Sequence, residues 1–287
     1  MAPEPKPLRD IEGLLIDAGG VLYQGDEAMD GSVEALARLR KARIPFRLLT
    51  NTTRTTRTAL AHKLRGFGFT VDEGEIVTPA SAAIAVLRRD GARPHLLVHP
   101  DLLPDCPPEA PAPDAVLIGD AGKHFTFENM NRAFNVLIGG GKLYALGKNR
   151  FFRGSQGLEL DAGPFVAALE YAAEVEAVLI GKPARDFFLA AADALTLAPQ
   201  KVAMVGDDVE SDVEGAIAAG LAGVLVKTGK FRDGDEARAK KGGAHVAASL
   251  ASFVEEFVQA SASRSAFAAA FTASRDTSSA PCRLKKP

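Results

Sequence analysis

Short apolar runs that end abruptly in a polar residue recur along this chain and constrain its fold more than any other feature. The runs are Leu14–Ile16 before Asp17, Phe46–Leu49 before Thr50, and Val202–Val205 before Gly206. Continuous runs of Leu, Ile and Val are typical of parallel strands buried on both faces of a sheet. Helical patterns lie between the runs, so we predict βαβ units and a Rossmann-like, doubly wound α/β fold.

Three helices are predicted from end signals between these strands. One begins at Ser32, which we expect to act as its N-cap, and another has Pro183 in its first turn. A third extends from about Ser211 to Gly220, where the glycine would terminate it.

Residues 79–179 have the pattern of a second α/β unit. We interpret Val178–Ile180 as the strand at which the first unit resumes, so the second unit is predicted to be a cap inserted into a core of residues 1–78 and 180–258. The composition changes to Ala, Ser, Thr and Arg near the end, and we expect residues 259–287 to be a disordered tail. Predicted strands of the cap are His95–Val98, Val116–Ile118 and Leu143–Leu146, and predicted helices are Ala80–Arg89, Phe127–Leu137 and Gly163–Ala173.

Charge and composition exclude several classes of partner. Lys and Arg total 34 against 36 Asp and Glu, so the formal net charge of −2 supplies no global field for binding nucleic acid or anionic lipid. The sequence has no apolar segment of about 18 residues, so we expect no membrane span, and we expect no secretory signal. Two cysteines do not make a disulfide framework or a zinc site. The cytoplasm is the expected location, with the nucleus as an alternative.

Polar residues after strands of a doubly wound sheet gather at one edge, where ligands bind. Asp17, Thr50 and Asp207 are therefore expected to be neighbours in space, although each alone could be a turn residue. The full set comprises four motifs in order: Leu15–Leu22, Leu48–Asn51, Gly181–Pro183, and Val205–Asp208 with Asp212.

These motifs supply a carboxylate, a hydroxyl, an ammonium group and an acidic cluster, a set that suits metal-assisted phosphoryl transfer. Mg²⁺ is usually held by one or two carboxylates with phosphate and water, and Asp17 with Asp207 would supply the pair. Lys182 and Thr50 could bind the oxygens on which transition-state charge is spread. The other oxygen of Asp17 could attack phosphorus and form an aspartyl-phosphate. The alternatives are a solvated lysine at a helix start for Lys182 and a turn or N-cap for the aspartates.

The motif set resembles the haloacid dehalogenase (HAD) superfamily of phosphatases, subfamily IIA, whose C2-type cap is inserted between the second and third motifs. The likeness extends from Ile11 to Val258. It implies a Mg²⁺-dependent hydrolase acting on a small phosphorylated substrate or a phosphoamino acid, and it allows a homodimer. Cap and loop segments that share the likeness are Phe125–Asn131, Leu146–Phe152, Leu160–Phe165 and Val226–Arg232.

The resemblance also implies roles for the substrate-binding residues. Asp17 would be the nucleophile and a metal ligand. Thr50 and the backbone of Asn51 would contact phosphate, and Lys182 would be the charge partner of nucleophile and phosphate.

The resemblance further implies the metal site. Asp207 would be the second protein carboxylate on Mg²⁺, with Asp208 and Asp212 supporting the acidic cluster. The chain departs from the family at Gly19, where most members carry an Asp that protonates the leaving group, and where pyrophosphate and phosphohistidine phosphatases would carry Ser. The backbone carbonyl of Gly19 can still bind the metal.

The missing acid at Gly19 bears on the substrate. General acid–base help is typically worth about 10²–10⁴-fold, and an alkyl phosphate, which expels an alkoxide, needs it most. Pyrophosphate expels phosphate, and a P–N bond can expel a neutral imidazole or amine. We therefore predict inorganic pyrophosphate, phosphohistidine or phospholysine as substrates. Two alternatives are a catalytically weak or silent phosphate-binding protein and a response-regulator-like phosphoacceptor, although the inserted cap argues against the latter.

Overall fold

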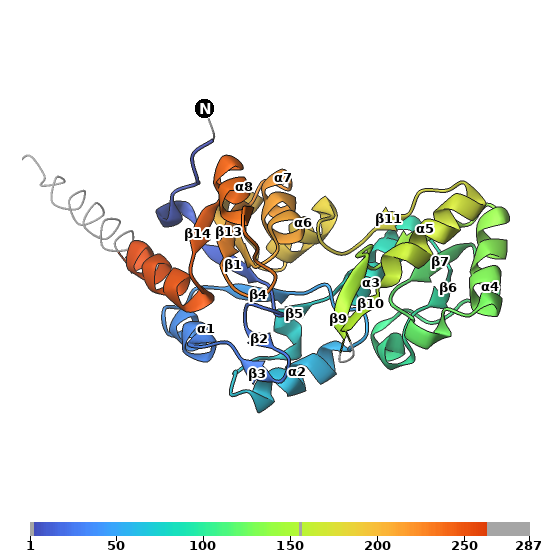
Figure 1. Ribbon diagram of the computed structural model, residues 1–287, viewed down its shortest axis with the longest axis horizontal. Helices are drawn as coiled ribbons and strands as arrows, with labels where there is room; N and C mark the ends of the chain where they lie inside the picture. The colour runs from blue at the N-terminus through green and yellow to red at the C-terminus, as the bar shows by residue number, and fades with distance from the viewer. Residues whose placement is uncertain (1–2, 155–156, 263–287) are drawn as a thin grey trace, which may run out of the picture.

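A six-stranded parallel sheet is the centre of the larger of two α/β units in this computed structural model, which describes residues 3–154 and 157–262. Its strand order is β14–β13–β12–β1–β4–β5 (Figure 1). The strands are β1 (Gly13–Ile16), β4 (Phe46–Leu49), β5 (Ile76–Val77), β12 (Val202–Gly206), β13 (Ala222–Val226) and β14 (His245–Ala247).

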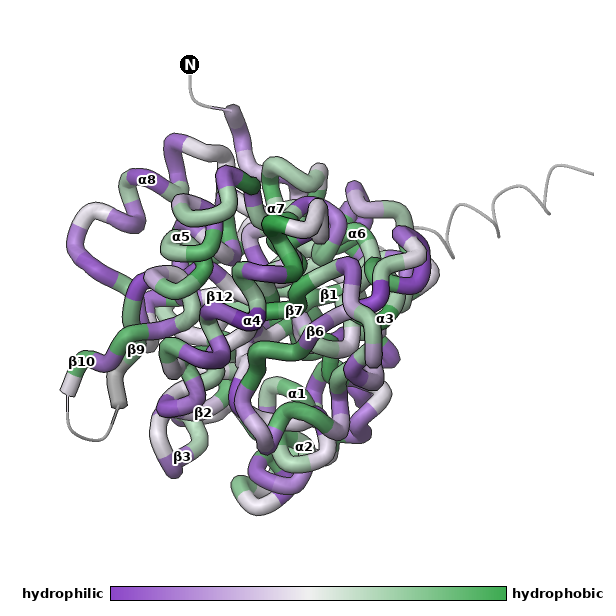
Figure 2. Tube along the Cα trace, turned by 90° about the vertical axis from the view of Figure 1, so that its right-hand side faces the viewer, coloured by the Kyte–Doolittle hydropathy of each residue, from purple (hydrophilic) through white to green (hydrophobic). Residues whose placement is uncertain are grey.

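The apolar runs form strands because both faces of this sheet are covered. Leu14 and Ile16 of β1 pack on α1 (Ser32–Lys41), α2 (Arg57–Gly66) and a helix over residues 250–262. Leu15 points to the opposite face, where it packs with α6 (Arg185–Asp193) and α7 (Gly215–Ala218). All three side chains are fully buried, which stabilises the fold by about 1.5–3 kcal/mol each. Figure 2 shows hydrophobic residues along the central strands and hydrophilic residues on outer turns such as those at α8 (Asp235–Lys241).

The winding direction of the sheet reverses between β1 and β12. The helix after β1 lies on one face, and the helix before β12 lies on the other. The crevice at such a reversal, beyond the carboxyl ends of the strands, is where doubly wound folds bind ligands. The fold thus places Asp17 and Asp207 at the expected edge.

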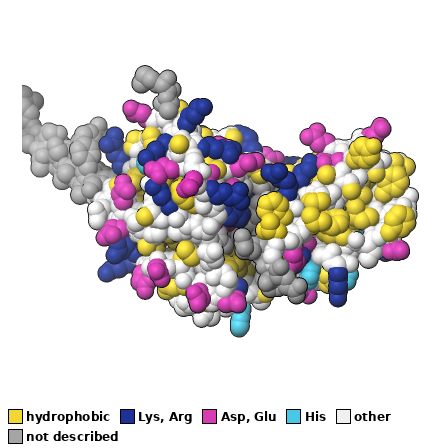
Figure 3. Space-filling view, viewed as in Figure 1, with side chains coloured by type: hydrophobic (Ala, Val, Ile, Leu, Met, Phe, Trp, Pro, Cys, Tyr) yellow, Lys and Arg dark blue, Asp and Glu magenta, His cyan; other side chains and the backbone are white. Residues whose placement is uncertain are grey.

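The second unit is built on a four-stranded parallel sheet of order β11–β8–β7–β6. Helices α4 (Phe127–Ile138) and α5 (Ala162–Ala173) cover one face, and α3 (Pro79–Asp90) with the 3-10 helix η3 (Pro100–Asp105) covers the other. Figure 3 shows exposed hydrophobic side chains gathered on this unit. The strands are β6 (Pro94–Leu97), β7 (Ala115–Ile118), β8 (Lys142–Ala145) and β11 (Val178–Leu179).

Strand β11 corrects one interpretation of the sequence. It pairs with β8 of the smaller sheet, so Val178–Ile180 is not where the larger sheet resumes. An apolar run does not identify its sheet, because pairing depends on where the chain places the strand.

Two antiparallel hairpins and several short helices complete the described residues. Hairpin β2–β3 follows β1, and β9–β10 precedes α5. The remaining bounds are β2 (Tyr23–Gln24), β3 (Glu27–Ala28), β9 (Phe151–Gly154), β10 (Gly157–Leu160), η1 (Leu8–Asp10), η2 (Glu73–Glu75), η4 (Gly122–His124), η5 (Pro199–Lys201) and the π-helix η6 (Val209–Glu214).

The predicted fold class is confirmed, while several predicted helix ends are wrong. Gly31 occupies the N-cap of α1, and Ser32 instead donates its hydroxyl to the carbonyls of Leu22 and Met29. Pro183 lies outside α6, whose N-cap is Ala184. The helix predicted from about Ser211 to Gly220 instead begins at Val209 as the π-helix η6 and continues as α7.

The helix over residues 250–262 extends past residue 258, where we expected the ordered chain to end. Phe253 and Phe257 of this helix are buried against the larger sheet, and this packing holds its C-terminal turn in place. The rest of the predicted tail, residues 263–287, lies outside the described residues. Within the part of the chain that is described, no helix is long and apolar enough to cross a bilayer.

Candidate active site

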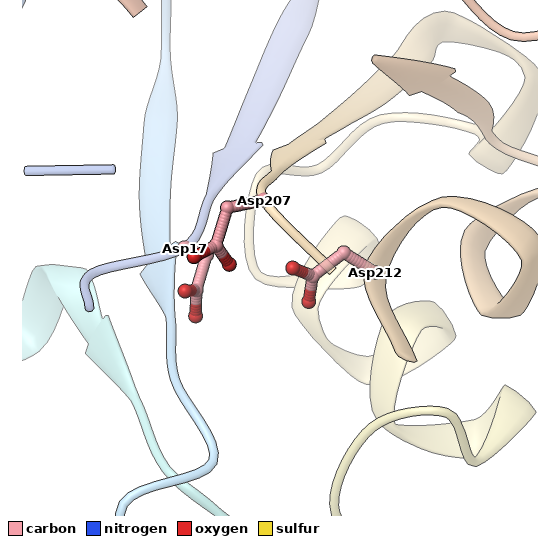
Figure 4. Close-up of side chains that lie close together, drawn as sticks. All are labelled: Asp17, Asp207 and Asp212. Atoms are coloured by element: carbon pink, nitrogen blue, oxygen red, sulfur yellow. The ribbon is translucent and has the colours of Figure 1, made fainter. Parts of the chain in front are cut away.

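Three aspartates meet at the carboxyl edge of the larger sheet (Figure 4). Asp17 follows β1 and Asp207 follows β12, and the amide of Asp17 donates to the carbonyl of Val205 at 2.9 Å. Asp212 comes from η6, the segment after β12. One carboxylate oxygen from each lies within 4.8 Å of the others, and all three residues are buried. The sheet therefore concentrates negative charge where little water reaches.

Lys182 offsets part of this charge. Its Nζ lies 2.5 Å from Asp17 Oδ1 and 2.7 Å from Asp212 Oδ1, and it donates to the carbonyl of Leu49 at 3.0 Å. Burial alone would lower the pKa of Lys182, but the two carboxylates outweigh it and raise the pKa. The ammonium group thus has a carboxylate or carbonyl oxygen on three sides. Lys182 is therefore a charged partner of the nucleophile candidate, not the solvated lysine of the alternative interpretation.

Asn51 holds Lys182 in place through the main chain. Its Nδ2 donates to the carbonyl of Lys182, and the amide of Lys182 donates to Asn51 Oδ1, both at 2.8 Å. Thr50 is buried beside it, with its amide on the carbonyl of Val77 at 3.2 Å. This side-chain role of Asn51 was not expected from the sequence, which pointed to its backbone only.

Asp207 lies in a cradle built by two loops. Its Oδ2 accepts the amide of Lys230 at 2.7 Å, and a Cβ on Gly20 or Gly229 would overlap this oxygen. Both glycines have positive φ, 77° and 57°, and the hydroxyl of Thr228 donates to the carbonyl of Gly20 at 2.6 Å, which ties the loops together. Glycine is thus required at both positions.

The other oxygen of Asp207 is left for a cation. Oδ1 is buried and accepts no hydrogen bond from any described residue. Burial, then the charges of Asp17 and Asp212, raise the pKa of Asp207. A buried carboxylate oxygen without a donor is costly unless a cation binds it, and the oxygen-only donor set suits a hard divalent metal. The residues present therefore fit such an ion.

Asp208 and Gly19 complete the predicted set. Asp208 caps η6 by accepting the amides of Glu210 and Ser211, both at 3.1 Å, so the capping interpretation applies to it. A Cβ on Gly19 would meet nothing within 4 Å. The position where many family members carry an acid is therefore open space.

Sequence reasoning missed Lys230 as a member of this site. The Lys230 side chain is 63% exposed, and its Nζ lies 3.4 Å from Asp208 Oδ2. Burial would lower the pKa of Lys230, but Asp17 and Asp208 outweigh it and raise the pKa. The sequence signal for Lys230 was that Thr228–Lys230 follows the apolar run of β13, as Asp207 follows that of β12. The structure shows that these two strands are neighbours.

Known proteins are similar to this chain in sequence and in fold. Residues 14–103 match a family model described as haloacid dehalogenase-like hydrolase, and residues 179–253 match one described as HAD-hydrolase-like. A phospholysine phosphohistidine inorganic pyrophosphate phosphatase from Xenopus laevis is 45% identical over 232 residues, covering 80% of this chain and 85% of the relative.

Two solved structures extend the likeness to the whole fold. A 4-nitrophenylphosphatase from Thermotoga maritima superposes with a TM-score of 0.80 at 28% identity, over 87% of this chain and 98% of that one. A glycerol phosphate phosphatase from Mycobacterium tuberculosis in complex with magnesium gives 0.76 at 25% identity, over 86% and 78%. The chain therefore belongs to the haloacid dehalogenase-like hydrolase family, on the branch of its phosphatases, as its motifs predict.

Proposed function

We propose that this chain is a Mg²⁺-dependent phosphatase that acts through an aspartyl-phosphate on inorganic pyrophosphate, on P–N bonds such as those of phosphohistidine and phospholysine, or on both. The observation that carries the proposal is the buried pairing of Lys182 with Asp17, beside an Asp207 oxygen that has no partner among the described residues. The relatives' names agree with it.

Asp17 is the proposed nucleophile. One carboxylate oxygen attacks phosphorus, the bond to the leaving group breaks, and its electron pair goes with the leaving group. Water then hydrolyses the aspartyl-phosphate and releases phosphate. Lys182 holds the Asp17 carboxylate in position through their ion pair. The hydroxyl of Thr50 and the amide of Asn51 would hold the phosphoryl oxygens.

Mg²⁺ would be held by Asp17, Asp207 and the main-chain carbonyl of Gly19, with Asp208 and Asp212 as supporting charges. When bound, it would neutralise charge on the phosphoryl oxygens. Asp212 forms an ion pair with Lys182, and Oδ1 of Asp207 accepts no hydrogen bond from the described part of the chain. The second oxygen of Asp207, Oδ2, lies in the glycine cradle, where it accepts the amide of Lys230, so we assign metal binding to Oδ1.

We propose that residues 79–179 act as a cap that selects the substrate. Two ion pairs link this unit to the segment after β4: Arg54 of the loop with Asp120, and Arg57 at the start of α2 with Asp105 at 3.6 Å. Arg54 also lies over the ring of Phe152 in hairpin β9–β10, 4.5 Å from its centroid. These contacts bring the hairpin next to the loop that begins with Thr50.

A substrate panel with Mg²⁺ tests the proposal. Pyrophosphate, a phosphohistidine peptide, a phospholysine peptide and a sugar phosphate are compared, with Asp17→Asn as the inactive variant and Asp26→Asn, at an exposed site, as its control. We expect turnover of pyrophosphate or a P–N substrate that Asp17→Asn abolishes.

Faster turnover of the sugar phosphate would contradict the substrate assignment. If none of the substrates is turned over in a way that depends on Asp17, the silent phosphate-binding protein is favoured. The open position at Gly19 supports that alternative.

A further inference from the structure

Two lysines face the carboxylates of the site and differ in how much of their hydrogen-bonding capacity is used. Lys182 is 3% exposed; it donates hydrogen bonds to Asp17 and to the Leu49 carbonyl, and it forms an ion pair with Asp212. Lys230 is 63% exposed, and the contact of its ammonium among the described residues is Asp208 at 3.4 Å, a long ion pair. Lys230 therefore has more hydrogen-bonding capacity left for a ligand than Lys182 has.

The main chain fixes the starting point of the Lys230 side chain. Its amide donates to Asp207 Oδ2 at 2.7 Å, and the preceding Gly229 packs against Gly20. Because Gly20 directly follows Gly19, the Gly229–Lys230 segment lies against the loop that contains the open position. From there the Lys230 side chain extends to Asp208, whose Oδ2 lies 3.4 Å from Nζ, and it remains largely exposed.

We propose that Lys230 is a substrate-binding residue that donates hydrogen bonds to the leaving phosphate of pyrophosphate, so that it sets the preference for phosphoanhydrides over P–N substrates. This inference rests on the proposed function of the same site. Lys230 would act where the leaving group departs from the substrate, and Gly19 provides no side chain there.

The chemistry of the two leaving groups explains the preference. When Asp17 attacks pyrophosphate, the bridging P–O bond breaks and its electron pair goes to the departing phosphate, which gains negative charge without needing a proton. Lys230 keeps its own proton and stabilises that charge. A P–N nitrogen that already carries its proton leaves as a neutral amine, so it offers no anion to Lys230.

Charge balance at the site points the same way. Asp17, Asp207, Asp208 and Asp212 would repel a polyanionic substrate. Lys182 and a bound divalent ion would offset most of the negative charge of these aspartates next to the phosphoryl group. Lys230, whose ammonium lies beside Asp208, is a further cation next to these carboxylates.

The experiment compares Lys230→Gln with Lys227→Gln. Lys227 precedes it by three residues on the same loop, but it pairs with Glu236 and not with an aspartate of the site. Loss of a charged hydrogen bond should lower kcat/KM for pyrophosphate by about 10- to 100-fold, while kcat/KM for inorganic phosphoramidate falls less than about 3-fold. Lys227→Gln should change neither, and Lys230→Arg should restore part of the pyrophosphate activity.

A binding arm separates failure of this inference from failure of the proposed function. Methylenediphosphonate, a non-hydrolysable analogue of pyrophosphate, is titrated into wild type and Lys230→Gln with Mg²⁺, and thermal midpoints confirm that both fold. We expect about 10-fold weaker binding to the variant. If wild type turns over nothing, the proposed function fails and this titration still decides the role of Lys230. Equal analogue affinity, or an equal fall in kcat/KM on both substrates, would overturn the inference.

Discussion

The ammonium group of Lys182 lies 2.5 Å from Asp17 Oδ1, although 165 residues separate them in the chain. The same ammonium is 2.7 Å from Asp212, and all three side chains are buried. Two carboxylates raise the pKa of the buried Lys182, so its ammonium group stays charged. The pairing thus prepares Asp17 for attack before any substrate arrives.

Replacing Lys182 by Met should abolish activity and lower the free energy of unfolding. The change leaves two buried carboxylates without their cation, which costs about 3–5 kcal/mol for a buried pair. Urea unfolding measures the loss. Lys201→Met is the control, because its pair with Glu12 is half exposed and should contribute less than about 1 kcal/mol. Equal effects of both changes would contradict the assignment.

Replacing Asp207 by Asn should weaken Mg²⁺ binding by more than about 10-fold and leave the fold intact. Loss of a residue that only supports a metal ligand already costs about 10–100-fold, and a ligand should cost at least as much. Calorimetric titration of Mg²⁺ checks this, with exposed Asp233→Asn as the control. Unchanged metal affinity would remove Asp207 from the site.

Replacing Gly229 by Ala should damage metal binding, because the new Cβ would overlap Asp207 Oδ2. Gly25→Ala provides a matched control: its φ of 61° is close to the 57° of Gly229, and a Cβ there meets nothing within 4 Å. Both changes carry the strain of positive φ, about 1–2 kcal/mol. Only Gly229→Ala should also weaken Mg²⁺ binding, and similar metal affinities for the two variants would rule out the cradle.

Replacing Gly19 by Asp should add a general acid where space exists for it. A Cβ there has no neighbour within 4 Å, and its backbone is outside the positive-φ region. We expect hydrolysis of a sugar phosphate to rise by as much as about 10²-fold, the lower end of acid–base catalysis, with a smaller change for pyrophosphate. A uniform change across substrates would show that the missing acid does not shape specificity.

Cys106 should be an unreactive thiol at neutral pH. Burial, helped by the charge of Asp105, raises the pKa of Cys106 to about 12. Since the thiolate is the nucleophile, its alkylation by iodoacetamide should be slower than that of a free thiol by at least about 100-fold at pH 8 and rise about tenfold per pH unit from pH 8 to 10. The measurement uses Cys282→Ser, so that one cysteine remains. A rate that levels off below pH 9 would contradict the raised pKa.

The predictable part of this protein lies in its short-range patterns. Leu14–Ile16 could be identified as a doubly buried strand because each of its side chains is apolar, and the residue after it could be placed at the sheet edge by the geometry of parallel strands. Three of the four motifs converge because each lies at the end of such a strand, whereas Lys182 follows β11 of the smaller sheet and is held at the site by Asn51. Helix ends were less secure, as Ser32 shows, because a hydroxyl has several main-chain carbonyls within reach.

By itself the sequence determined the alternation of buried strands and helices, the residue types at the site and the absence of an acid at Gly19, since these depend on local composition. Only the tertiary structure decided that β11 joins the smaller sheet, that Asn51 holds Lys182, and that Lys230 lies beside Asp207. Those contacts join segments that are separated in the chain and meet only once it is folded. Their formation depends on three-dimensional distance and the exclusion of water, and neither can be read from sequence spacing.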